Sequence, residues 1–180
     1  LDNSSLIYYR KAVLWSAYSF LRRGDVQDSD SYLSKISTKS LDKEELYIYY
    51  NIKAEIDESM GSMKEAYENY ILASNVTSDE SRKTYIYRKL IYLSELSKDL
   101  KSKAKFIELL EPHIDNLTEL RNLKIDWIEA KRSVNEFDEI IQEIDNIIEQ
   151  DEFKSIKAKL LIHKSKAYKN LNKIKSSKDI

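Results

Sequence analysis

The sequence predicts an all-α fold, built as an array of stacked antiparallel helical hairpins, from three observations. First, its 180 residues include only two glycines and one proline, too few for the closely spaced turns of a strand-rich fold. Second, apolar residues recur at helical spacing along almost the whole chain. Third, the breaks in this pattern recur at a fixed interval. A single helical hairpin cannot bury its apolar face alone, so the hairpins are expected to stack.

The breaks in the apolar pattern define nine expected helices. Asp42 with Glu45, and Thr77 with Glu80, have the spacing of capping boxes at two helix starts. Pro112 lacks a backbone donor and is expected to end the helix before it. The expected helices span residues about 5–23, 25–37, 42–60, 62–75, 79–97, 99–111, 117–134, 136–149 and 153–171.

The turns between paired helices share one register. Gly24 and Gly61 are 37 positions apart, and the same step leads on to Lys98, Asn135 and Asn172, each of which falls in an expected turn. Two positions after each turn residue stands an apolar side chain: Val26, Met63, Leu100, Phe137 and Ile174. We therefore predict a single repeat domain over residues 1–180, with units at about 5–40, 41–77, 78–115 and 116–150 and a C-terminal helix within 151–180.

The segment from Tyr47 to Glu80 has the most complete copy of the repeat. It combines an aromatic and a small residue in the first helix with a turn glycine and alternating small and bulky residues in the second. These residues are Tyr50, Ala54, Gly61, Met63, Glu65, Ala66, Tyr70 and Ala73. In this pattern the chain resembles the tetratricopeptide (TPR) family of helical-hairpin repeats. The resemblance implies a right-handed array of about four hairpins plus a C-terminal helix, whose first helices line a groove for a peptide or a partner helix.

A spectrin-like set of three-helix bundles is the alternative architecture. It requires helices that run without a break through Gly24, Gly61 or Asn135. Glycine in a helix interior costs about 1 kcal/mol relative to alanine, so such helices are possible. The fixed spacing of the breaks favours the hairpin array over this alternative.

Composition and charge exclude several functional classes. The 30 basic and 31 acidic residues nearly balance, which argues against a general nucleic-acid or anionic-membrane surface. The absence of cysteine excludes disulfides, thiolate catalysis and cysteine-type zinc sites. No apolar run approaches the roughly 18 residues of a membrane-spanning helix.

No arrangement of residues indicates catalysis, a cofactor or a metal. His113 and His163 are far apart and lack the spacing of metal-binding helices. The two glycines are isolated, so no phosphate-binding loop is present. The acidic run Asp25–Asp30 lacks the central glycine of a calcium loop. We expect no enzyme and no cofactor; a small-molecule enzyme would require an unexpected pocket between helices.

The sequence therefore predicts a non-enzymatic module that binds a partner protein or serves as a scaffold. Tyrosine and arginine, the residue types that often dominate binding energy, occur on the expected first helices. The TPR resemblance implies groove-facing residues Lys11, Leu14, Tyr18, Asn51, Glu55, Tyr85, Arg88, Lys89 and Tyr92. Leu14 and Tyr18 occupy two places where carboxylate-gripping members of the family use Lys or Asn. A partner's C-terminal carboxylate is therefore not the expected ligand, and a partner segment in a mixed apolar and charged groove is.

A structural spacer or self-associating subunit of a bacterial cell envelope is the alternative function. The chain begins at Leu1 rather than methionine and continues with the polar residues Asp2–Ser5. This start suggests a processed protein with an upstream signal or lipid anchor, as in a periplasmic lipoprotein. The residue usage is typical of an AT-rich bacterial genome. An extracytoplasmic location is expected, with a cytoplasmic one as the alternative.

Overall fold

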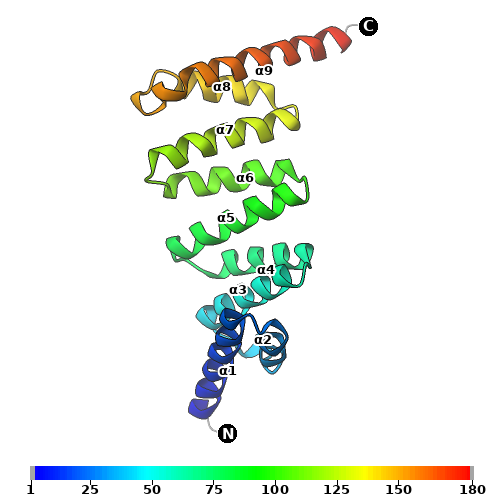
Figure 1. The fold of residues 1–180 in the computed structure, drawn as a ribbon, viewed down its shortest axis with the longest axis vertical. Helices are drawn as coiled ribbons and strands as arrows, with labels where there is room; N and C mark the ends of the chain where they lie inside the picture. Colours follow the sequence, from blue (N-terminus) through cyan, green and yellow to red (C-terminus); the bar gives the residue numbers. More distant parts are fainter. Residues whose placement is uncertain (1–2, 179–180) are drawn as a thin grey trace. The chain divides into compact units, whose positions relative to one another are not determined.

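The computed structural model describes residues 3–178, and every regular element in this range is helical (Figure 1). The α-helices are α1 (Asn3–Arg23), α2 (Val26–Leu33), α3 (Lys43–Ser59), α4 (Met63–Val76), α5 (Glu80–Leu96), α6 (Leu100–Leu110), α7 (Leu117–Ser133), α8 (Phe137–Ile147) and α9 (Lys157–Lys178). Short 3-10 helices span Thr38–Ser40, Glu111–His113 and Asp151–Ile156. The predicted all-α class is confirmed. Within residues 3–178, no helix has the length and apolarity needed to cross a membrane.

The chain divides into two compact units between Leu93 and Ser94, inside α5. The N-terminal unit holds α1 to α4 and most of α5, and the C-terminal unit holds α6 to α9. The predicted single domain over residues 1–180 stays a prediction. Leu1 and Asp2, from which an upstream signal was expected, lie outside the described residues, as do residues 179–180 of the predicted C-terminal helix unit.

Four of the five predicted turn positions have the same backbone. Gly24, Gly61, Lys98 and Asn135 all have positive φ, at 85°, 80°, 59° and 65°. The residue after each donates its N–H to the carbonyl five positions back, at 2.8–3.0 Å. This hydrogen bond is the one that closes a helix in the Schellman motif. The next helices begin at Val26, Met63, Leu100 and Phe137, so the interval of 37 residues is present in the backbone.

These turns bear on two sequence expectations. Because helices end at Gly24, Gly61 and Asn135, the unbroken helices that the spectrin-like alternative requires are absent at these positions. The fifth expected turn, at Asn172, is wrong, since α9 continues through it to Lys178. Asparagine tolerates a left-handed backbone but does not require one, and it costs less than about 1 kcal/mol inside a helix.

The predicted helix caps are right in one case and wrong in the other. At the start of α3, the Asp42 side chain accepts from the Glu45 N–H and the Glu45 side chain accepts from the Asp42 N–H, so the capping box is confirmed. Thr77 instead follows the last residue of α4. The α5 start is capped by Asp79, whose carboxylate accepts from the Arg82 N–H at 2.9 Å. Aspartate is at least as good a cap as threonine, and it lies directly before the helix.

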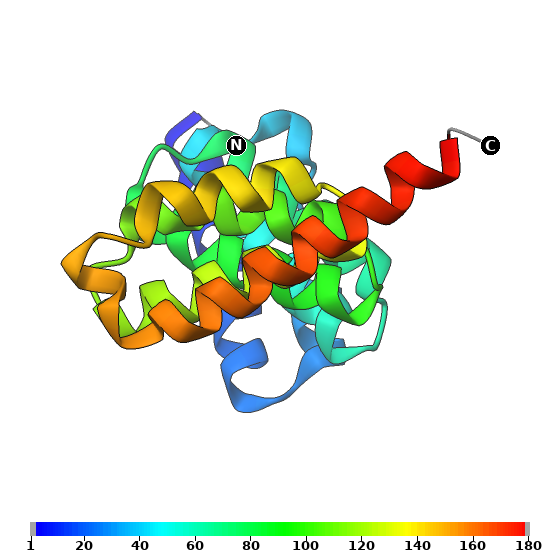
Figure 2. The ribbon, with the colours of Figure 1, turned by 90° about the horizontal axis from the view of Figure 1, so that it is seen from above.

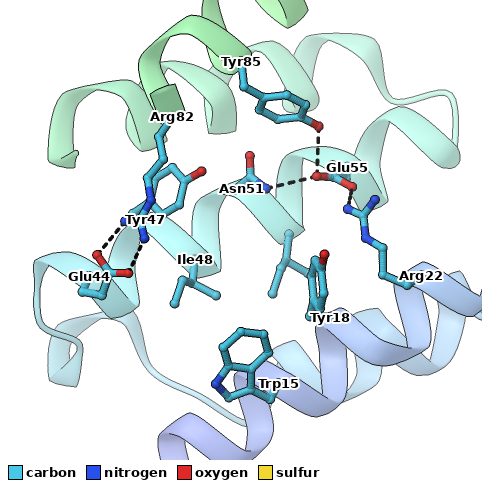
Figure 3. A pocket seen from close by; sticks show the side chains of 11 residues that line it. Trp15, Tyr18, Arg22, Glu44, Tyr47, Ile48, Asn51, Glu55, Arg82 and Tyr85 are labelled. Atoms are coloured by element: carbon cyan, nitrogen blue, oxygen red, sulfur yellow. Dashed lines mark hydrogen bonds and ion pairs between the residues drawn. The ribbon is translucent and has the colours of Figure 1, made fainter. Parts of the chain in front are cut away.

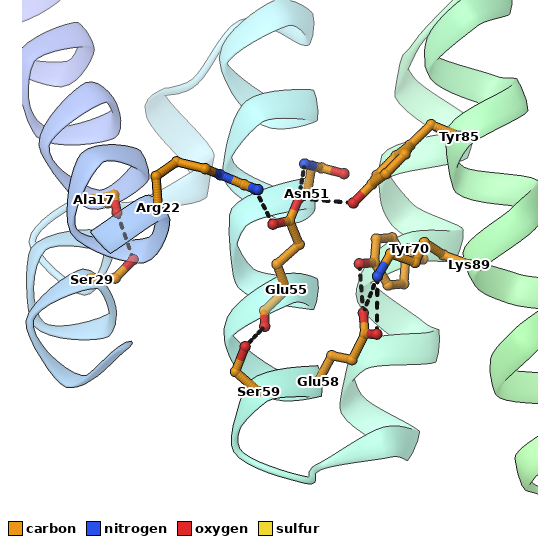
Figure 4. A network of polar contacts seen from close by, with 10 residues as sticks. All are labelled: Ala17, Arg22, Ser29, Asn51, Glu55, Glu58, Ser59, Tyr70, Tyr85 and Lys89. Atoms are coloured by element: carbon orange, nitrogen blue, oxygen red, sulfur yellow. Dashed lines mark hydrogen bonds and ion pairs between the residues drawn. The ribbon is translucent and has the colours of Figure 1, made fainter. Parts of the chain in front are cut away.

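In the N-terminal unit, α1 packs on α2, and α3 packs on α4. Ala54 on α3 and Ala66 and Ala73 on α4 are fully buried, and their small side chains leave room for two helices to lie close together. Between α1 and α2, the buried Ser29 hydroxyl donates to the Ala17 carbonyl at 2.7 Å (Figure 4). Buried polar groups without such partners would cost stability.

In the C-terminal unit, Lys124 on α7 is a buried cation. In the sequence it interrupts a repeat column whose earlier members are Val13, Tyr50 and Tyr87. Its side chain is 10% exposed and its ammonium group contacts the carboxylates of Glu111, at 2.7 Å, and Glu143. Although burial opposes the charge, hydrogen bonds from the ammonium group to these two carboxylates raise the pKa of Lys124 above its usual value. At this position of the repeat, the C-terminal unit thus has a buried lysine paired with two carboxylates, whereas the earlier repeats have a valine or a tyrosine.

His163 on α9 is a second buried polar side chain in the C-terminal unit. It is 5% exposed, and its Nδ1 has no hydrogen-bond partner. Burial lowers the pKa of His163, and the nearby charges of Arg132, Lys166 and Lys159 lower it further, whereas Glu129 acts in the opposite direction. The folded state therefore favours the neutral imidazole.

We expect the C-terminal unit to lose stability as the pH falls below about 6.5, the usual pKa of histidine. Below this value the unfolded chain binds a proton that the folded unit resists, so stability declines until the pH passes the lowered folded pKa. Urea unfolding at pH 7.5 and 5.5, followed by the fluorescence of the buried Trp127, measures the effect. His163→Gln should reduce this pH dependence. An unchanged pH dependence in His163→Gln would contradict the assignment.

Candidate functional site

A hollow of about 430 Å³ opens on the N-terminal unit between α1, α3 and α5 (Figure 3). This volume lies within the usual range for ligand sites, roughly 300–1,000 Å³. Its lining comes from all three helices: Trp15, Tyr18, Arg22, Glu44, Tyr47, Ile48, Asn51, Ile52, Glu55, Arg82 and Tyr85. We call this surface the hollow.

Helical spacing explains how each element presents its part of the hollow. From α1, Trp15, Tyr18 and Arg22 follow one another at intervals of three and four residues and so share one face. From α5, Arg82 and Tyr85 are three apart. α3 supplies the residues between these two walls, and its apolar side chain Ile52 also belongs to the buried core of α1, α2 and α3. The hollow therefore lies directly over a packed core.

At one end of the hollow, Glu55 joins side chains from all three helices. The Tyr85 hydroxyl and the Asn51 amide nitrogen each donate to Glu55 Oε1 at 3.0 Å. Arg22 forms an ion pair with Glu55 Oε2 and lies over the Tyr18 ring, 4.8 Å from its centre. The Glu55 side chain is 13% exposed. With three donors around it, this carboxylate is already satisfied within the protein.

At the other end, Arg82 and Glu44 form a two-pronged ion pair. The two guanidinium nitrogens donate to the two carboxylate oxygens at 2.6 Å each. Hydrogen bonds from Arg82 hold the pKa of Glu44 below its usual value, so the pair stays charged at neutral pH. The guanidinium also lies 4.3 Å from the centre of the Tyr47 ring. Each arginine of the hollow is thus held between a carboxylate and an aromatic face.

Between the two ion pairs, the hollow is aromatic and aliphatic. Trp15 is 60% exposed, and its ring meets Tyr18 edge to face with 5.8 Å between the centroids. Burial raises the pKa of Tyr47 and of Tyr85, so both phenols are neutral donors at physiological pH. Exposed rings that lie next to one another, as Trp15 and Tyr18 do here, are typical of an interaction surface.

Asn51 places an unpartnered acceptor in the hollow. Its amide nitrogen is bonded to Glu55, whereas its Oδ1 is buried and has no hydrogen-bond partner. A buried acceptor without a donor costs roughly 1–3 kcal/mol. Because this oxygen is buried, a bound molecule could donate to it only after the Asn51 side chain moved.

The structure brings together four of the nine residues predicted to bind a partner: Tyr18, Asn51, Glu55 and Tyr85 line the hollow. Leu14 is a correction, because it is 2% exposed and belongs to the core of the N-terminal unit. It lies on the inner side of α1 and has no surface to offer.

The other four predicted residues lie outside the lining of the hollow. Lys11, Arg88 and Tyr92 are exposed on α1 and α5. Lys89 is engaged elsewhere, because its ammonium group donates to both oxygens of Glu58 at 2.9–3.0 Å (Figure 4). That contact joins α5 to α3 within the unit.

Sequence reasoning missed seven residues of the hollow: Trp15, Arg22, Glu44, Tyr47, Ile48, Ile52 and Arg82. A usable signal was present in α1, where Trp15 and Arg22 stand three positions before and four after Tyr18. Most of the predicted residues stand at equivalent positions of successive repeats, 37 residues apart, such as Tyr18, Glu55 and Tyr92. The three helices are not equivalent around the hollow, because α3 forms its base and α1 and α5 form its walls. Each helix therefore lines the hollow with residues from different positions of the repeat.

Within the part of the chain that the structure describes, no group of three or more His, Asp or Glu side chains is placed to hold a metal ion. The chain was also compared with known proteins. No family model matches it, and neither the curated proteins nor the solved structures include a match.

Proposed function

We propose that this protein is a non-enzymatic interaction module that holds a segment of a partner protein in the hollow between α1, α3 and α5. The observation that carries the proposal is the set of partly exposed rings from two helices, Trp15 and Tyr18 of α1 and Tyr85 of α5, gathered over a packed core. Tryptophan, tyrosine and arginine are the side chains most often found at binding hot spots. A TPR-like stack of hairpins is part of the proposal, supported by the four identical turns at intervals of 37 residues.

The charges around the hollow favour an uncharged anchor residue on the partner. Both arginines and both carboxylates are already paired with each other, so a charged anchor would have to displace an existing partner. The middle of the hollow offers rings and Ile48. We infer a segment that inserts a bulky aromatic or aliphatic side chain.

The pairing of the carboxylates also supports binding over acid–base catalysis. Glu55 accepts three hydrogen bonds or ion pairs, and Glu44 is held by both nitrogens of Arg82. A general base needs a free lone pair directed at substrate. The tyrosines keep raised pKa values and do not ionise near neutral pH.

Selection of displayed random peptides on the intact chain tests the proposal. We expect the selected peptides to share an aromatic or aliphatic anchor residue and to protect the Trp15 fluorescence from iodide quenching. Their affinity for the Trp15→Ser or Tyr85→Ala variant should be at least about 30-fold weaker than for the wild type, as for a hot-spot residue. Trp15 is 60% exposed, so its loss should leave the fold intact.

Two variants on the same helices serve as matched controls. Tyr8→Ser removes an aromatic side chain of α1 that is 75% exposed, and Tyr92→Ala removes one of α5 that is 48% exposed; neither lines the hollow. Both should bind the selected peptides as the wild type does. Equal binding by Trp15→Ser would contradict the proposal. Concentration-dependent dimers in sedimentation that Trp15→Ser abolishes would instead favour the self-associating subunit.

A further inference from the structure

The last two α-helices of the C-terminal unit separate their charges. α8 carries acidic residues and no basic one, whereas α9 is rich in lysine and has no acidic residue. The two helices pack on each other, and two lysines of α9 pair with acids from the α8 side: Lys164 with Asp145, and Lys157 with Glu149 at 2.7 Å. The near-zero net charge of the chain therefore conceals a strongly basic helix.

Few residues of α9 are buried, and the side of the helix that faces away from them is exposed. Leu160, His163 and Ala167 are the described α9 residues that are buried. In Figure 2 the end of α9 extends past the end of α8. The outer side chains of Lys159, Lys166 and Lys169 are all exposed, and none of them forms an ion pair in the described part of the chain. Among the α9 side chains that the structure describes, these three lysines are not paired with an acidic residue of α8.

Apolar side chains share this outer side of α9. Leu161, Ile162 and Tyr168 are 48%, 55% and 46% exposed. Residues seven apart lie in one row along a helix, which gives four rows on the outer side. In order around the helix they are an apolar row of Leu161 and Tyr168, a small and polar row of Ala158, Ser165 and Asn172, a mixed row of Ile162 and Lys169, and a basic row of Lys159 and Lys166. The surface thus grades from apolar to cationic across half of the helix.

We propose that this outer surface of α9 docks the protein on an anionic lipid bilayer, with the lysines at the headgroups and Leu161, Ile162 and Tyr168 at the acyl boundary. Helices that lie in a membrane interface combine lysine with exposed apolar side chains in this way. A nucleic acid would use the lysines but offers little to exposed leucine and isoleucine. The surface is separate from the hollow, so the proposal does not depend on the proposed function. It differs from the expectation, drawn from net charge, that an anionic-membrane surface is absent.

Co-sedimentation of the full chain with vesicles tests the proposal. At 0.1 M salt we expect binding to vesicles of phosphatidylcholine with 30% phosphatidylglycerol and little binding to phosphatidylcholine alone. The triple variant K159Q/K166Q/K169Q should lower the partition coefficient about 100-fold, since each lysine near an anionic surface contributes about fivefold. The variant L161S/I162S/Y168S should lower it at least about tenfold. Circular dichroism checks that each variant stays helical.

The matched control removes the same charge elsewhere. K64Q/K101Q/K105Q replaces three exposed lysines on α4 and α6 and should leave vesicle binding within about twofold. Equal binding to neutral and anionic vesicles, or an unaffected α9 lysine variant, would overturn the proposal. So would binding of duplex DNA or polyglutamate that rivals the anionic vesicles and is insensitive to L161S/I162S/Y168S, because that result would assign α9 to a polyanion.

Discussion

Replacing Tyr70 with alanine should lower the free energy of unfolding of the N-terminal unit by about 3–5 kcal/mol, the usual cost of emptying a large buried aromatic site. Tyr70 lies on α4 and is fully buried. Its hydroxyl donates to Glu58 Oε2 at 3.0 Å, and Glu58 is in turn held by Lys89 (Figure 4). One ring thus fills the space beside α3 and supports a polar contact to α5. Urea unfolding followed by circular dichroism measures the loss.

Tyr70→Phe separates the ring from its hydroxyl. It keeps the packed volume and loses one hydrogen bond to a carboxylate, so we expect a cost of about 1.5–3 kcal/mol, less than that of alanine. Burial raises the pKa of Tyr70, and the phenol therefore acts as a neutral donor at neutral pH. If the alanine variant lost less than the phenylalanine variant, the packing argument would be wrong.

The all-α class and the turns could be predicted because both depend on local chemistry. A glycine or asparagine at a fixed interval marks where the backbone must turn left-handed, and Gly24, Gly61 and Asn135 do so. Lys98 adopts the same φ although lysine does not favour it. There the register of the repeat, and not the residue type, was the reliable signal. At Asn172 the register alone was insufficient, and α9 continues.

The hollow could be predicted only in part, because it depends on how three separate helices face one another. Tyr18, Asn51, Glu55 and Tyr85 were expected in a groove because the TPR resemblance implies it, and they line the hollow. Helical spacing alone identifies only which residues share a face of one helix. It could not decide which of the adjacent residues Leu14 and Trp15 faces outward. Both are apolar and suit a core. The structure buries Leu14 and exposes Trp15.

The surface of α9 shows the limit of arguments from total composition. Thirty basic and 31 acidic residues nearly cancel over the whole chain, but electrostatic attraction acts over about 10 Å at 0.1 M salt. At that range a helix without acidic residues, such as α9, is a local cation. Which of its lysines stay unpaired depends on the neighbouring α8, and so required the structure.

The second large effect is expected at the turns: Gly61→Val should lower the free energy of unfolding by about 2–3 kcal/mol. Gly61 has a φ of 80°, which side chains branched at Cβ rarely adopt. A Cβ built at Gly61 meets no atom within 4 Å, so the cost comes from the backbone conformation and not from a clash. Gly61→Ala should therefore also be destabilising, by about 1–2 kcal/mol.

The same backbone argument predicts that a substitution by glycine at Lys98 increases the free energy of unfolding. Its φ of 59° already carries the strain that a side chain causes there, so Lys98→Gly should stabilise the C-terminal unit by about 1 kcal/mol. Asn135→Gly should gain less, because asparagine tolerates this conformation. Ser62→Ala, next to Gly61 and without a side-chain capping bond, should stay within about 0.5 kcal/mol of the wild type. Urea midpoints for the five turn variants test these expectations: a destabilising Lys98→Gly would mean that contacts of the lysine side chain stabilise this turn more than its left-handed backbone destabilises it.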